Sequence, residues 1–87
     1  MKRKNGFVLQ KIHGDTYAIA VTKESAEVGS MVRLNPTAAF LFELLGEERS
    51  YEDCLGALLA QYEVDEETAR RDLDRFLDGL KGAGLLA

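Results

Sequence analysis

The spacing of apolar residues changes within the stretch MVRLNPTAAFLFELL at residues 31–45. Residues 31–34 alternate in a way that predicts a short strand. Its two faces would carry Val32 with Leu34 and Met31 with Arg33. From residue 36 onward the apolar residues recur every three or four positions, which is typical of an amphipathic helix. Asn35 fits the N-cap, Pro36 fits the first helical position, and Gly46 is placed to end the helix. A strand is therefore expected to lead directly into a helix.

The preceding residues predict two further strands joined by a tight turn. Residues 7–13 alternate imperfectly, and their inward positions would be Phe7, Leu9 and Ile12. Gly14 and Asp15 tolerate the backbone of a tight turn. In residues 17–22 large side chains alternate with small ones, and the large face is expected to be buried. That face would consist of Tyr17, Ile19 and Val21. The polar residues 23–30 would form a loop to the third strand of an antiparallel sheet.

Two more helices follow the first one. Ser50 and Asp53 have the spacing of a capping box, so the second helix is expected to begin at about Tyr51. Its buried face would consist of Cys54, Leu55, Leu58, Leu59 and Tyr62. Asp65 fits the N-cap of the third helix, and two glycines would end that helix. Its buried stripe would consist of Ala69, Leu73, Phe76, Leu77 and Leu80.

The order of three strands and three helices predicts one α+β domain over residues 1–87, with the helices on one face of a three-stranded antiparallel sheet. This arrangement is compatible with a winged helix-turn-helix whose wing has moved to the N-terminus. No apolar run approaches the length of a membrane span, and the basic residues 2–4 are not followed by a signal-peptide pattern. A cytoplasmic protein without a membrane partner is therefore expected.

The charge distribution bears on the partners more than the net charge of −4 does. Residues 1–14 contain lysines and an arginine but no acid, whereas residues 43–78 are rich in acids. The acidic half would repel phosphate backbones, and the second helix lacks the basic side chains of a DNA-recognition helix. No nucleic-acid partner is therefore expected, although the fold leaves a winged-helix DNA-binding regulator as an alternative. Charge runs are also often simple solvated faces.

Residues that could carry catalysis are few. Cys54 lies in an apolar stripe, where a small buried hydrophobe is expected rather than a nucleophile. His13 adjoins the predicted turn and is interpreted as a surface residue. Asp72, Asp74 and Asp78 are interleaved with arginines along one helix, so they are expected to be solvated rather than to bind a metal. One cysteine and one histidine allow neither a disulfide nor a cysteine-histidine zinc site. The sequence predicts no enzyme, no metal and no cofactor.

Peptide binding fits the predicted fold better than catalysis does. If the third strand is an edge, its unpaired backbone groups could accept an extended peptide as a fourth strand. One side of the third helix would form the other wall of the site, with Arg70, Leu73, Asp74, Leu77 and Lys81. The same residues also fit an ordinary core with an amphipathic rim. A structural subunit that docks on a larger enzyme through this helix, and a dimer formed by strand exchange, stay open as alternatives.

Three stretches resemble the PqqD-like family, which recognises precursor peptides in pathways of ribosomally made, modified peptides. They are GFVLQKIHGDTYAIAV at residues 6–21, LNPTAAFLFELL at residues 34–45 and YEVDEETARRDLDRFLDGLKGAGLL at residues 62–86. The most specific pieces are residues 34–35 with 37–39, and the register of Asp72, Phe76, Leu77, Leu80, Gly84 and Leu85. None of these pieces is a catalytic motif.

The resemblance implies a non-catalytic adaptor that binds the leader segment of a precursor peptide as an added strand. It further implies that the adaptor presents the precursor to a modifying enzyme, often of the radical S-adenosylmethionine type. Carried over to this sequence, the strand wall is Ser30, Met31, Val32 and Arg33, and the helix wall is Arg70, Leu73, Asp74 and Leu77. The scaffold residues would be Leu34, Asn35, Ala39, Phe42 and Phe76. The N-terminal hairpin and residues 22–30 differ from members that serve pyrroloquinoline quinone assembly, so no particular pathway is implied.

Overall fold

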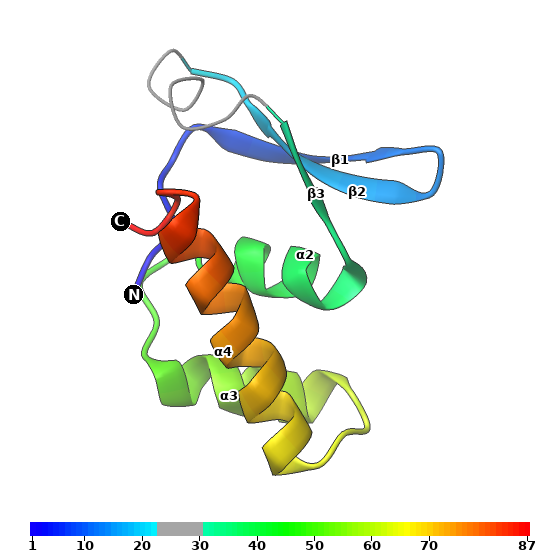
Figure 1. Cartoon of the computed structure of the whole chain (residues 1–87), viewed down its shortest axis with the longest axis vertical. Helices are drawn as coiled ribbons and strands as arrows, with labels where there is room; N and C mark the ends of the chain where they lie inside the picture. Colours follow the sequence, from blue (N-terminus) through cyan, green and yellow to red (C-terminus); the bar gives the residue numbers. More distant parts are fainter. Residues whose placement is uncertain (23–30) are drawn as a thin grey trace.

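The computed structural model describes residues 1–22 and 31–87, and it shows the predicted α+β order of three strands followed by three helices (Figure 1). The elements are β1 (Phe7–Ile12), β2 (Asp15–Ala20), β3 (Met31–Leu34), α2 (Pro36–Leu44), α3 (Tyr51–Gln61) and α4 (Glu66–Gly82). The strands form one antiparallel sheet in the order β1-β2-β3. The predicted loop at residues 23–30 lies outside the described residues. None of the helices in the described part of the chain combines the length and the apolar character that crossing a membrane requires.

The turn between β1 and β2 lies one residue earlier than the sequence predicts. His13 and Gly14 both have positive φ angles, 52° and 85°, and Ile12 pairs with Asp15 across the turn. Two central residues with positive φ are the mark of a type I′ turn, whose twist matches that of the flanking strands. Asp15 therefore begins β2 and is not a central residue of the turn, while His13 lies on the surface as expected.

The buried face of the sheet is the one with the small side chains, so the predicted face of β2 is wrong. Ala18 is completely buried, whereas Val21 is 60% exposed and Tyr17 and Ile19 are only partly covered. Since Ala18 has no bulk beyond Cβ, α2 can pack closely against the middle of the sheet. Alternation predicts that one face is buried but does not say which. Ile12, expected to point inward, is exposed because it lies on the outer face of the sheet.

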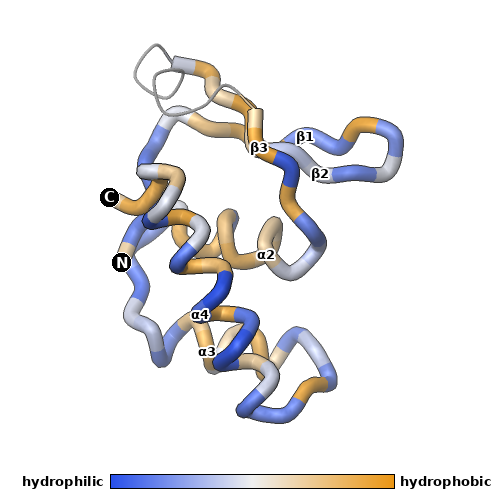
Figure 2. The backbone as a smooth tube through the Cα atoms, viewed as in Figure 1, coloured by the Kyte–Doolittle hydropathy of each residue, from blue (hydrophilic) through white to orange (hydrophobic). Residues whose placement is uncertain are grey.

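The core forms where α2 meets the sheet and the other two helices. Figure 2 shows α2 as almost uniformly hydrophobic, whereas hydrophilic and hydrophobic positions alternate along α4. The Phe42 ring meets the Phe7 ring edge to face at 5.9 Å, which joins α2 to β1. The fully buried members of the core with the largest side chains are Phe42, Leu41, Leu45, Leu58, Leu73 and Cys54. Burial raises the pKa of the Cys54 thiol, as expected of a core cysteine. Leu59, predicted in the core, is 36% exposed.

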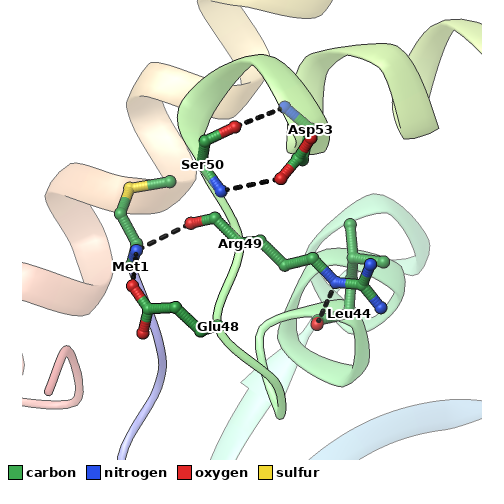
Figure 3. Close-up of polar contacts among 6 residues, drawn as sticks. All are labelled: Met1, Leu44, Glu48, Arg49, Ser50 and Asp53. Carbon is green, nitrogen blue, oxygen red and sulfur yellow. Dashed lines mark hydrogen bonds and ion pairs between the residues drawn. The ribbon is translucent and has the colours of Figure 1, made fainter.

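All three helices begin at the predicted caps. The Asn35 side chain accepts a hydrogen bond from the Ala38 N–H at 2.8 Å. Ser50 and Asp53 form the reciprocal capping box, which Figure 3 shows beside the connection from α2. Asp65 accepts from the Thr68 N–H at 2.7 Å. These bonds satisfy orphan donors at each helix start, so the strand-to-helix junction at Asn35 is fixed locally.

The N-terminal segment ties the helical layer to the end of the chain. The Arg3 N–H donates to Leu45, and Arg3 forms an isolated bridge with Leu86. The Arg3 guanidinium donates to the Phe42 carbonyl at 2.6 Å and lies 4.4 Å from the centre of the Phe42 ring. Burial lowers the pKa of Arg3. This arginine of the basic N-terminus therefore has a structural role.

Candidate functional site

Among the described residues, β3 is the edge strand of the sheet, and the hydrogen-bond register shows which of its residues face away from β2. The Val21 N–H donates to the Gly6 carbonyl at 2.7 Å, on the side of β2 that faces β1. Residues of an antiparallel ladder alternate between pairs that exchange hydrogen bonds and pairs that do not. Odd-numbered residues of β2 therefore bond to β1, and even-numbered ones bond to β3. Because Ala18 lies opposite Val32, Val32 bonds to β2.

By the same alternation, Met31 and Arg33 direct their backbone N–H and C=O groups away from β2. Within residues 1–22 and 31–87, no strand pairs with this side of β3. Exposed edges of this kind are templates for a further strand. The expectation of an open edge ahead of Asn35 is thus met in the described part of the chain.

A groove of about 360 Å³ lies between β3, the start of α2 and the C-terminal half of α4. In Figure 1, β3 runs down into α2 while α4 crosses in front, with its C-terminal end toward the sheet. The lining residues are Val32, Leu34, Asn35, Thr37, Ala38, Asp72, Arg75, Phe76, Gly79, Leu80, Ala83 and Leu85. Most of them are apolar, as in typical ligand sites, and the volume is near the lower end of the range of about 300–1,000 Å³ for such sites.

The residues of α4 that line this groove are not those of the predicted helix wall. We call Asp72, Arg75, Phe76 and Gly79 the groove face of α4. The predicted wall, which we call the closed face, is Arg70, Leu73, Asp74 and Leu77. Leu73 is completely buried in the core, and Leu77 is half-buried against it. The predicted wall therefore lies on another side of the helix.

The polar members of the closed face are occupied by contacts with α3. The Tyr51 hydroxyl donates to Asp74 at 2.7 Å, and this bond raises the pKa of Tyr51. Arg70 lies 3.7 Å from both Glu52 and Glu66. Its guanidinium also lies 5.8 Å from the centre of the Tyr51 ring. The contacts of Asp74 with Tyr51 and of Arg70 with Tyr51 and Glu52 join the N-terminal half of α4 to the first turn of α3, so the closed face is an interface within the fold.

The predicted strand wall is divided between the two faces of β3. Val32 is half-buried and lines the groove. Met31 is 55% exposed on the outer face of the sheet. Arg33 lies on that outer face too, where it forms an ion pair with Asp15 at 3.2 Å. Ser30 lies outside the described residues.

The sequence interpretation missed the groove face although a usable signal was present. Asp72, Arg75, Gly79 and Ala83 recur at the spacing of a single helix side. Two of these residues are small, and a glycine leaves room for a ligand to approach the backbone closely. Among the described residues, neither Asp72 nor Arg75 has an ion-pair partner. The groove thus combines an apolar floor with two charges on its rim.

The family comparison matches residues 8–86 to the model of coenzyme PQQ synthesis protein D (PqqD). The chain belongs to the PqqD family. The resemblance inferred from the sequence is therefore confirmed. No curated protein matches the chain.

Two solved structures share the PqqD fold of this chain. "TbiB1 in Complex with the TbiA(beta) Leader Peptide" is 28% identical with a TM-score of 0.74, and the match covers 99% of this chain and 94% of that one. "Lasso peptide synthetase B1 complexed with the leader peptide" is 23% identical with a TM-score of 0.68, covering 97% and 93%. The second likeness shows the fold alone.

Proposed function

We propose that this protein is a peptide-binding adaptor, which binds the leader segment of a precursor peptide as a fourth strand on β3. The observation that carries the proposal is the position of the outward backbone groups of Met31 and Arg33 beside the apolar groove. The solved structure of TbiB1, which is 28% identical to this chain, is a complex with a leader peptide. Strand addition would take affinity from the backbone and selectivity from the groove.

Both parts of the site are needed on energetic grounds. Met31 and Arg33 each offer one N–H and one C=O, and a hydrogen bond contributes a net of about 0.5–1.5 kcal/mol. Micromolar affinity requires about 8 kcal/mol, and association itself costs at least about 4 kcal/mol. The open edge alone falls short of this sum. Side chains buried in the groove must supply the remainder.

The adaptor would hold the precursor for a separate modifying enzyme, of the radical S-adenosylmethionine type, in the cytoplasm where the precursor is made. In this role the protein contributes binding and positioning but no reacting group. The Cys54 thiol is buried and its pKa is raised, which disfavours the reactive thiolate and is consistent with a role in binding.

The direct test is a titration of isotope-labelled protein with the precursor peptide encoded beside its gene. We expect the largest amide shifts at Met31 and Arg33 and along the groove face of α4, from Asp72 to Gly79. Shifts confined to the closed face, or no binding at high micromolar peptide, would reject strand addition on β3. Salt-dependent binding to duplex DNA without peptide binding would favour the winged-helix regulator.

A pair of proline variants distinguishes the outward backbone groups of β3 from those that are hydrogen-bonded to β2. Arg33→Pro removes an outward N–H, and proline is tolerated on an edge strand, so the variant should fold but bind peptide weakly. Arg33→Ala is the matched control, because it removes the side chain and keeps the N–H. Val32→Pro removes a donor to β2 and should destabilise the sheet itself. Equal peptide affinity of Arg33→Pro and Arg33→Ala would contradict the proposal.

A further inference from the structure

A strand added to β3 would present its side chains to the groove in a fixed alternation. Residues directly opposite each other in neighbouring strands point to the same face of the sheet. Val32 lines the groove, whereas Met31 and Arg33 lie on the outer face. The peptide residue opposite Val32 would therefore point into the groove. Its two neighbours, opposite Met31 and Arg33, would point outward.

The α4 wall of the groove is open at Gly79. A Cβ atom at this position would meet no atom within 4 Å. Ala83, one turn later, is also small, and the apolar side chains of Phe76, Leu80 and Leu85 line the same groove. The C-terminal end of α4 lies toward the sheet in Figure 1, and Leu85 is hydrogen-bonded to Lys4 just ahead of β1. Val32 on β3 and Gly79 on α4 line the same groove.

We propose that Gly79 sets the size of the side chain that the groove accepts. The protein would select an extended segment with one large apolar residue opposite Val32, flanked by residues whose side chains matter little. The chemical class follows from the lining, because space beside apolar side chains gains most when apolar surface fills it. This inference rests on the proposed function, since it assumes that the peptide adds to β3.

Gly79→Leu is the variant that tests the inference, because its side chain would fill the space beside position 79 that the peptide side chain is proposed to occupy. Gly56→Leu is the matched control, because Gly56 also lies within a helix with no atom within 4 Å of a Cβ and does not line the groove. Both changes replace a helical glycine by a better helix former, so neither should lower the thermal unfolding midpoint.

The probe is a display library of random linear peptides selected on the wild-type protein, with the selected peptides then measured singly. We expect one position to require a large apolar residue and its neighbours to vary. The affinity for Gly79→Leu should fall at least about tenfold, and that for Gly56→Leu should stay unchanged. Replacing the large residue by alanine in the peptide should reverse the preference, so that Gly79→Leu binds the shortened side chain no worse than wild type does.

The outcomes separate this inference from the proposed function. Selected peptides that lose affinity on Arg33→Pro but bind wild type and Gly79→Leu equally would overturn the role of Gly79 and leave strand addition standing. Selected peptides that share no fixed apolar position but lose affinity on Arg33→Pro would also overturn the role of Gly79 and leave strand addition standing. If no peptide is enriched and the precursor peptide does not bind, the adaptor function fails, and this inference fails with it.

Discussion

The two faces of α4 are built from similar residues but differ in how far the chain itself satisfies them. The closed face has a completely buried leucine, a hydrogen bond to Tyr51 and ion pairs to neighbouring carboxylates. The groove face has a half-buried phenylalanine, an open glycine position and two charges without ion-pair partners among the described residues. One face holds the helix in the fold. The other face lines the groove.

This difference teaches that the sequence spacing of a helix does not by itself show which side is free. Both flanks of the buried stripe alternate apolar and charged residues, and both would be called amphipathic. What distinguishes them is the neighbour that each one meets. α3 packs against one flank, whereas β3 stands across a groove from the other. Substitutions on the two faces should therefore separate stability from binding.

The largest expected effect is the loss of stability in Leu73→Ala. Leu73 is completely buried, so truncation leaves a cavity and should lower the free energy of unfolding by about 2–5 kcal/mol. Phe76→Ala on the groove face should cost less stability, because that ring is only partly buried, but should weaken peptide binding more. Chemical denaturation and peptide titration of both variants test the comparison. If Leu73→Ala stays stable and loses peptide, the two faces have been assigned the wrong way round.

Local signals in the sequence predicted the start of every helix and the strand-to-helix junction, because caps and prolines act over three or four residues. The side that each element buries was harder to predict. On β2 the small Ala18, not the large Ile19, faces the core because α2 approaches closely. On α4 the position of β3 decides which flank lines the groove. Both depend on contacts between distant parts of the chain, which periodicity does not contain.

The next effect concerns Asn35, which caps α2 and also lines the groove. Asn35→Ala removes the acceptor for the Ala38 N–H and should lower the free energy of unfolding by about 1 kcal/mol. Asn35→Asp keeps the acceptor and is the control. Because the cap fixes where β3 ends, Asn35→Ala should also weaken peptide binding. A loss of stability with unchanged peptide affinity would show that the groove does not depend on this junction.

Acid should lower the stability of the folded state by weakening the Asp65 cap of α4, the helix that carries both faces. Hydrogen bonds from Thr68 hold the pKa of Asp65 below its ordinary value of 3.8. The ionised cap therefore stabilises the folded state at higher pH, and this contribution is lost as the pH falls below 3.8 toward the folded pKa. Asp65→Asn keeps an oxygen acceptor that does not titrate, so its stability should depend less on pH in this range. Identical acid-unfolding curves for the variant and the wild type would contradict this role.

The smallest expected effect lies at the exposed hydrogen bond of the closed face. Tyr51→Phe removes the donor to Asp74, and Asp74→Asn weakens the acceptor; each should lower stability only slightly, because water competes for both groups. The double variant should lose less than the sum of the two, since the bond can be broken only once. Peptide affinity should not change in any of the three, because the bond faces α3. A loss of peptide affinity in Tyr51→Phe would mean that the first turn of α3 and the N-terminal half of α4 belong to the binding site, and that the closed face is open to ligand.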